Sequence, residues 1–182
     1  MSIFEKIKLW RGVGKLLNTN AGAQLYAGTA GFWNRAAGTA APNLSDEIPW
    51  TPISKPLAES TVALISTAGF YRDGDEPFDM DVPDGDPSFR EIPMAIDPNA
   101  LKIAHTHYPN RYAESDPNVL LPLDHLLELA DAGVFSLSSR LFSFGFGGTL
   151  TRAYLNEPDG TAHQVARKLK EDGVDLALLV PA

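Results

Sequence analysis

The sequence at residues 62–69 is Val62-Ala63-Leu64-Ile65-Ser66-Thr67-Ala68-Gly69, an apolar run that ends in small polar residues and a glycine. Such a run, apolar on both faces, is typical of a buried parallel strand that enters a loop. Similar short runs at residues 101–106, 134–137 and 174–180 predict three further strands.

Two segments between these strands have the signals of helices. Residues 122–133 begin with a proline, continue with apolar residues at helical spacing and end at a glycine. Residues 161–171 are followed by Asp172-Gly173, which predicts a second helix that ends there. Strands that alternate with helices indicate an α/β fold, and we expect a three-layer, mostly parallel β-sheet flanked by helices.

The first part of the chain has a different character. Apolar residues at helical spacing predict a helix over residues 2–17, with Ser2 as its N-cap. A basic amphipathic helix of this kind can rest on a membrane, but we favour packing on the domain or on a partner. Residues 18–48 are rich in Ala, Gly, Thr and Asn and contain few core-forming side chains, which is typical of a flexible segment. We therefore predict an N-terminal helical and flexible arm over residues 1–47 and an α/β domain over residues 48–182.

Composition excludes several classes of function. The net charge of −8 disfavours nucleic acid and anionic membranes as partners. The chain contains no stretch of about 18 apolar residues and no signal-peptide pattern, so we expect a cytoplasmic protein. Because the 182 residues include no cysteine, disulfides, thiolate metal sites and a cysteine nucleophile are absent from this sequence.

Ligands of open α/β sheets bind beyond the carboxyl ends of the strands, and this rule selects the candidate site residues. His105 and His107 lie at the carboxyl end of the strand predicted at residues 101–106 and would share one face of it. They fit acid–base chemistry or substrate contact, a metal site completed by Glu114 or Asp116, or a structural hydrogen bond, and we favour the first. The other candidates, all for substrate binding, are Ser66, Thr67, Tyr108, Arg111 and Arg140.

Two further patterns carry less information about function. Residues 73–86 hold seven carboxylates without the regular spacing of a calcium loop, which favours a solvated or lid-like loop. Gly145-Phe146-Gly147-Gly148 lacks the Lys-Ser/Thr of a P-loop, so we interpret it as a flexible turn or a close approach to a ligand. We accordingly expect no cofactor and no metal.

Several blocks of sequence between residues 48 and 182 together resemble the glycine/sarcosine/betaine/D-proline reductase selenoprotein B family. The most specific of them runs from Asp116 to Val134, and the first 47 residues lie outside the resemblance. The remaining blocks are Ile48–Pro52, Lys55–Leu57, Val62–Gly69, Glu76–Phe78, Phe89–Pro93, His105–Tyr108, Asp172–Asp175 and Leu178–Pro181.

The resemblance implies reductive cleavage of a C–N bond by a selenolate or thiolate. In that family the strand similar to Leu176–Val180 leads into a loop that bears selenocysteine or cysteine. The resemblance then implies that His105 and His107 protonate the departing nitrogen, while Arg111 or Arg140 holds a substrate carboxylate. This sequence stops at Ala182, before such a loop, and we favour a selenocysteine codon read as a stop over a natural small subunit or a non-catalytic relative.

Three functional hypotheses follow. The first is a component of a reductase that acts on C–N bonds of amino acids or related amines, inactive by itself, with an exposed apolar sheet end or pocket beside the last strand. The second is a non-catalytic assembly subunit that forms a homo- or hetero-oligomer through the arm at residues 1–47. The third, a metal-dependent hydrolase that uses His105 and His107, is the one we favour least.

Overall fold

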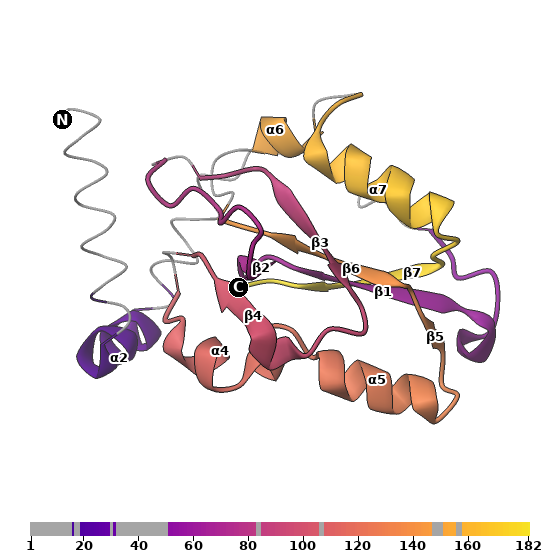
Figure 1. Cartoon of the computed structure of the whole chain (residues 1–182), viewed down its shortest axis with the longest axis horizontal. Helices are drawn as coiled ribbons and strands as arrows, with labels where there is room; N and C mark the ends of the chain where they lie inside the picture. Colours follow the sequence, from indigo (N-terminus) through magenta and orange to yellow (C-terminus); the bar gives the residue numbers. More distant parts are fainter. Residues whose placement is uncertain are drawn as a thin grey trace.

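A central sheet of five strands forms the core of the computed structural model, which describes residues 16, 19–29, 31, 51–82, 85–105, 108–146, 151–155 and 158–182 (Figure 1). Its middle strand is β1 (Thr61–Ser66). Strands β5 (Ser136–Leu137), β6 (Arg140–Phe144) and β7 (Leu176–Val180) all pair with β1 in parallel. The remaining strand, β3 (Phe89–Pro93), runs antiparallel to β6.

The register places these strands on two sides of β1. Strand β7 pairs with β1 from Val62 to Ser66, a span that includes Val62, which also pairs with β5, and Ile65 and Ser66, which also pair with β6. A strand offers two edges, so β5 and β6 share the edge opposite β7. They are two parts of one extended segment, and the strand is interrupted at Ser138 and Ser139. The order across the sheet is therefore β3, then β6 with β5, then β1, then β7.

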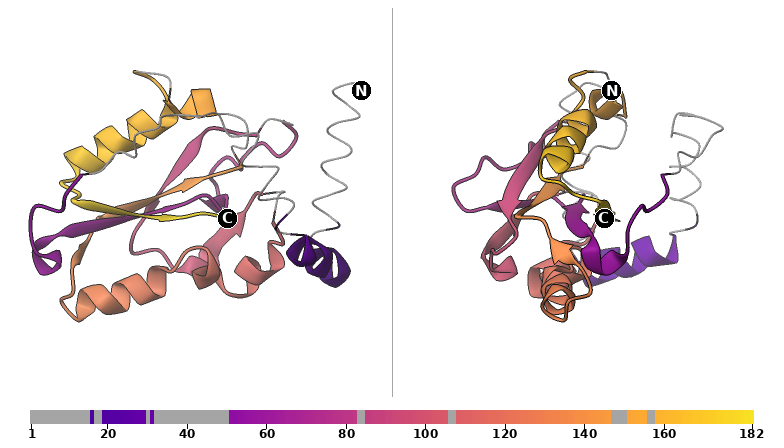
Figure 2. Two further views of the ribbon diagram at one scale, coloured as in Figure 1. Left: turned by 180° about the vertical axis from the view of Figure 1, so that it is seen from behind. Right: turned by 90° about the vertical axis from the view of Figure 1, so that its right-hand side faces the viewer.

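Helices cover both faces of this sheet, which confirms the three-layer, mostly parallel α/β prediction. Helix α5 (Leu123–Asp131) lies on one face and α7 (Thr161–Glu171) on the other (Figure 2). Alternation along β1 divides the core between them, since Leu64 packs in the cluster beneath α5 and Ile65 in the cluster beneath α7. Both clusters are well buried, and Leu64 has no exposed surface.

The helices predicted over residues 122–133 and 161–171 are confirmed as α5 and α7, and the strands predicted over residues 62–66 and 174–180 as β1 and β7. Two other strand predictions need correction. The strand predicted over residues 101–106 is the short β4 (Leu101–Ile103), which pairs antiparallel with β2 (Phe70–Arg72) in a separate two-stranded sheet. The strand predicted over residues 134–137 is β5, but the extended segment continues beyond it as β6. Its real carboxyl end is therefore Phe144 and not Leu137.

Short elements join these layers. The helices are α2 (Asn20–Gly28), α4 (Arg111–Ser115) and α6 (Thr151–Leu155), and the 3-10 turns are η1 (Leu57–Glu59), η2 (Pro98–Ala100) and η3 (Pro117–Val119). Asn118 in η3 exchanges two hydrogen bonds with Asp124 in the first turn of α5, at 2.8 and 3.1 Å, and so fixes the start of that helix.

Most of the arm at residues 1–47 falls outside the described residues, and with it the helix predicted over residues 2–17. Of that arm the structure describes α2 and a few neighbouring residues. Across all described residues, no helix has the length and apolar character needed to cross a membrane.

Candidate functional site

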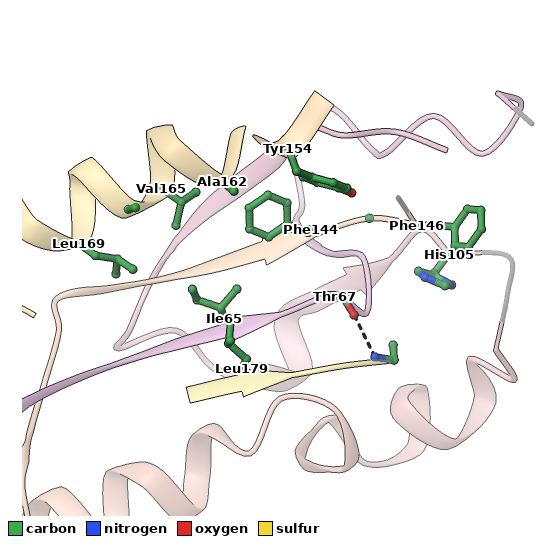
Figure 3. Close-up of a pocket in the computed structure, with 13 residues that line it drawn as sticks. Ile65, Thr67, His105, Phe144, Phe146, Tyr154, Ala162, Val165, Leu169 and Leu179 are labelled. Carbon is green, nitrogen blue, oxygen red and sulfur yellow. Dashed lines mark hydrogen bonds between the residues drawn. The ribbon is translucent and has the colours of Figure 1, made fainter. Parts of the chain in front are cut away.

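The carboxyl ends of β1, β6 and β7 meet at one edge of the sheet. The amide of Thr67, just after β1, donates to the carbonyl of Val180 at 3.1 Å. The amide of Ala182, just after β7, donates to the Thr67 hydroxyl at 2.9 Å (Figure 3). On the other side, the Gly69 amide donates to the carbonyl of Phe144 at 2.9 Å. The ends of the three parallel strands are thus tied together at the position where open α/β sheets bind ligands.

An open cavity of about 600 Å³ lies at this edge, between the sheet and helices α6 and α7 (Figure 3). Its wall is almost entirely apolar, and its side-chain polar groups are the hydroxyls of Thr67 and Tyr154 and the imidazole of His105. A mostly apolar pocket with a few converging polar groups is the usual form of a small-molecule site. The cavity is lined by Ile65, Thr67, His105, Phe144, Gly145, Phe146, Tyr154, Ala162, Val165, Ala166, Leu169, Leu179 and Ala182.

His105 is held firmly at the polar end of the cavity. Its side chain is only 5% exposed. The ring packs against Tyr108, with centroids 4.7 Å apart, and edge-on against Phe146 at 5.8 Å. Its carbonyl accepts a hydrogen bond of 2.9 Å from the Asn110 side chain. His105 follows β4, so the strand predicted over residues 101–106 ends before it. His107 lies outside the described residues, so its predicted alignment with His105 stays a prediction.

Two tyrosines near the cavity have raised pKa values and remain protonated near neutral pH. Burial, with a smaller contribution from Glu114, raises the pKa of Tyr108 well above its usual range. Its hydroxyl donates to the carbonyl of Ala68 at 2.9 Å, so Tyr108 supports the loop behind His105. Burial and then Asp86 raise the pKa of Tyr154 to about 12. Tyr154 therefore presents a neutral phenol to the cavity.

The structure brings only some of the predicted site residues to this cavity. Thr67 and His105 line it, and Tyr108 packs behind His105. Ser66 is fully buried and donates to the carbonyl of Leu120 at 2.8 Å, which is a structural contact. Arg111, at the start of α4, is not among the residues that line the cavity.

Arg111 instead contacts its neighbours on the molecular surface. It stacks on the ring of Tyr112 with 4.7 Å between the guanidinium carbon and the ring centroid, and it donates to Tyr112 Oη at 2.7 Å. A second hydrogen bond joins it to the side chain of Asn20 in α2. These contacts link α4 to the described part of the arm.

Arg140 lies at the other end of β6, among charged residues. It donates two hydrogen bonds to Asp172, at 2.7 and 2.8 Å, and one to Glu91 at 2.6 Å. Glu91 also pairs with Lys168 at 2.9 Å. The Arg140 hydrogen bonds hold the pKa of Asp172 below its usual range. For Glu91, partial burial acts to raise the pKa, but Lys168 and Arg140 outweigh it and the net shift is downward. This cluster joins β3, β6 and the end of α7.

Arg140→Gln should lower the free energy of unfolding by about 1–2 kcal/mol near neutral pH, because charge-assisted hydrogen bonds in a partly buried network are lost. The native pKa values of Asp172 and Glu91 are depressed. The contribution is therefore complete above the unfolded pKa values and is lost as the pH falls through the folded ones. Urea unfolding of both proteins at several pH values measures this, and the difference should shrink in acid.

Arg167→Gln is the matched control, because Arg167 makes one hydrogen bond, to the carbonyl of Pro158, from an exposed position. A change of about 0.5 kcal/mol or less is expected for it. A difference between wild type and Arg140→Gln that stayed constant down to pH 2 would contradict the ionic origin of the effect.

The described residues contain no group of three His, Asp or Glu side chains placed to hold a metal ion. The metal-dependent hydrolase hypothesis therefore gains no support from them. His107, the second imidazole of that hypothesis, is outside the described residues.

A known protein family matches most of the chain. The family model for glycine/sarcosine/betaine reductase selenoprotein B matches residues 40–182. The chain belongs to this family. This confirms the resemblance seen in the sequence.

One curated member of similar sequence is the D-proline reductase subunit gamma of Acetoanaerobium sticklandii. It is 36% identical over 131 residues, which make up 71% of this chain and 52% of the relative. The chain thus spans about half the length of this relative. No solved structure matches the chain.

Sequence reasoning missed most of the cavity wall. Phe144, Tyr154, Val165 and Leu169 line the cavity, and none of them was a candidate. The glycine at position 145 was the available signal. A Cβ built there would lie 2.7 Å from the ring of Phe78, so the close backbone approach expected of this glycine is to a side chain of the protein itself.

Proposed function

We propose that this chain is the substrate-pocket component of a reductase that cleaves C–N bonds of amino acids or related amines. The observation that carries this proposal is the cavity at the carboxyl ends of β1, β6 and β7, with Thr67 and His105 at its polar end. Family membership supplies the reaction class, because the family and its relative are named for reductases of glycine, sarcosine, betaine and D-proline.

The redox nucleophile is supplied from outside these 182 residues, which include no cysteine. A selenolate or thiolate on this polypeptide or on a partner faces the cavity when it lies at the carboxyl ends of β1 and β7, next to Thr67 and Ala182. It attacks the substrate carbon, and the electron pair of the C–N bond leaves with nitrogen, which takes a proton relayed by His105. A second thiol then attacks the selenium or sulfur and releases the carbon, which is protonated. A dithiol reductant restores the thiols, so the amine is exchanged for hydrogen at the cost of one dithiol.

The residues that this chain contributes bind and orient the substrate. The apolar wall excludes water from the reacting carbon, which strengthens the polar contacts inside the cavity. Thr67 holds the strand ends through its backbone and side chain and presents its hydroxyl to the cavity. His105, fixed between Tyr108 and Phe146, provides the group that transfers the proton. His107 remains a second candidate for this role.

His105→Gln should weaken the binding of the preferred ligand by about three- to tenfold, the usual effect of losing one hydrogen bond. Ligand-detected NMR with glycine, sarcosine, betaine and D-proline measures this on the isolated chain. With a dithiol reductant present, the isolated chain should release no ammonia or amine, because it has no thiolate of its own.

His125→Gln is the matched control, since His125 is an exposed histidine on α5 and does not line the cavity. Equal loss of binding in both variants, or no binding of any of the four compounds, would contradict the assignment of the cavity. Release of amine by the isolated chain would contradict the external nucleophile.

A non-catalytic assembly subunit is the second candidate. The relative is named as a subunit, and the hydrogen bond between Arg111 and Asn20 of α2 supports a contact between the arm and the domain. In this alternative the arm joins the chain to copies of itself or to another subunit of a complex in the cytoplasm. Deleting residues 2–45 and measuring the mass in solution separates the two hypotheses, because an unchanged oligomeric state would count against the assembly role.

A further inference from the structure

Strand β7 has the composition of an interior strand but lies at an edge of the sheet. Its residues, Leu176–Val180, are all apolar. Within the described residues it pairs with β1 alone. Strands with continuous apolar sequence usually belong inside parallel sheets, where both faces are covered and both edges are paired.

The side chains of β7 are far less covered than those of the neighbouring strand. Leu64 and Ile65 of β1 are 0% and 8% exposed. Their register partners on β7, Leu178 and Leu179, are 40% and 68% exposed. Residues 178 and 179 point to opposite faces, so the helical layers that cover β1 on both faces stop short of β7 on both faces.

The opposite edge of the same sheet shows what a protected edge looks like in this molecule. Strand β3 carries Arg90, Glu91 and Pro93 among its five residues. Charged residues and proline are the usual means by which proteins block unwanted pairing at a sheet edge. Strand β7 carries neither, so its free edge has the features of a surface that another strand covers.

We propose that the free edge of β7 receives a strand from the part of the family's length that this chain does not span. The chain corresponds to 52% of the D-proline reductase subunit gamma, so that relative has about as much polypeptide again to supply a strand and a covering layer. The occupant is thus a segment similar to the unmatched part of that relative, whether it continues this polypeptide or belongs to a separate one.

The position of the cavity favours this occupant over a second copy of the chain. Leu179 and Ala182 line the cavity, so a parallel strand beside β7 would bring its own carboxyl end to the Thr67 edge and close the cavity on that side. Two copies joined by their β7 edges would pair antiparallel about a two-fold axis and place Asp175 of one beside the strand end of the other. Each copy also carries a net charge of −8, which opposes self-association.

The test is thiol labelling at a single position. The sequence contains no cysteine, so Leu178→Cys introduces the only thiol of the chain. In the isolated chain this thiol should react readily with a maleimide. Addition of the segment of the Acetoanaerobium sticklandii subunit that lies outside the matched region should slow the reaction at least tenfold, as read from the mass of this chain. Pairing in a sheet uses backbone hydrogen bonds, so a segment from a relative is a suitable probe.

Leu129→Cys is the matched control, since Leu129 on α5 is 43% exposed and Leu178 is 40% exposed. Its reaction should be unaffected by the segment. Leu178→Lys, checked for retained fold by circular dichroism, should weaken binding of the segment at least tenfold, whereas Leu129→Lys should not.

Three results would overturn the proposal. One is that the segment does not slow the labelling of the Leu178→Cys thiol, whether or not the segment binds elsewhere on the chain. Another is protection that grows with the concentration of the chain alone, which would show a second copy at this edge. The third is slow labelling of the isolated chain at high dilution, which would show that the chain covers β7 itself. None of these depends on ligand binding, so this inference and the function proposed for the cavity can fail separately.

Discussion

Phe142→Ala is expected to lower the free energy of unfolding by about 3–5 kcal/mol, the usual cost of removing a fully buried aromatic ring. Phe142 has no exposed surface and lies on β6 in the core cluster beneath α7. Its ring meets Phe89 of β3 edge-on, with centroids 5.9 Å apart. The truncation would leave a cavity between the sheet and α7, with β6 held between β3 and β1. Urea unfolding followed by circular dichroism measures the loss.

Phe142→Leu retains most of the apolar volume and should cost clearly less than the alanine variant. Leu155→Ala provides the surface comparison, because Leu155 is 44% exposed, and a change of about 0.5 kcal/mol is expected for it. A loss below about 1 kcal/mol for Phe142→Ala would mean that α7 does not pack on the sheet as the structure shows.

The elements that the sequence predicted correctly have local signals. Helix α5 begins after Pro122 and ends before Gly133, which adopts a φ of +75°. Helix α7 ends in the same way before Gly173, with a φ of +69°. Positive φ at the residue after a helix is easy for glycine and costly for other residues, so a few neighbouring residues determine where these helices end. The apolar runs of β1 and β7 are equally local.

The pairing of β3 with β6 has no local signal. Its register joins Phe89 to Phe144 and Pro93 to Arg140, and these partners are distant in sequence. The charged and proline residues of β3 resemble a loop, although they are the protection of an edge strand. The same difficulty affected Arg140. The break at Ser138 and Ser139 made it look like a residue beyond a strand end, whereas it opens β6 at the amino end, away from the cavity.

The candidate site was predictable only where its residues have a local signal in the sequence. Thr67 follows the predicted strand that is β1, and the rule on carboxyl ends selects it. His105 was selected by the same rule from the strand predicted over residues 101–106, but β4 belongs to a separate antiparallel sheet, so the rule reached His105 through a wrong premise. Tyr154, Val165 and Leu169 line the cavity from helices, where an apolar side chain facing a pocket has the same sequence pattern as one facing the core. Whether such a face is filled or leaves a cavity depends on packing between distant segments, which a single sequence does not reveal.

Gly69→Ala is expected to cost about 2–5 kcal/mol, from two causes that add. Gly69 has a φ of +75°, a left-handed conformation that costs other residues about 1–2 kcal/mol. A Cβ at this position would also lie 2.4 Å from the carbonyl oxygen of Ala104, and relief of such overlap by backbone movement costs about 1–3 kcal/mol. Urea unfolding measures the total.

Gly74→Ala separates the two causes, because Gly74 has a φ of +91° but nothing within 4 Å of its Cβ position. This variant should show only the conformational cost of about 1–2 kcal/mol. Gly69 also accepts the amide of Ala104 and donates to the carbonyl of Phe144, both at 2.9 Å, so it holds the segment before His105 against the end of β6. The alanine that displaces Ala104 must therefore move His105, and Gly69→Ala should weaken ligand binding where Gly74→Ala does not. Equal losses of stability in the two variants, or unchanged binding in both, would show that the approach of Gly69 to Ala104 does not position the site.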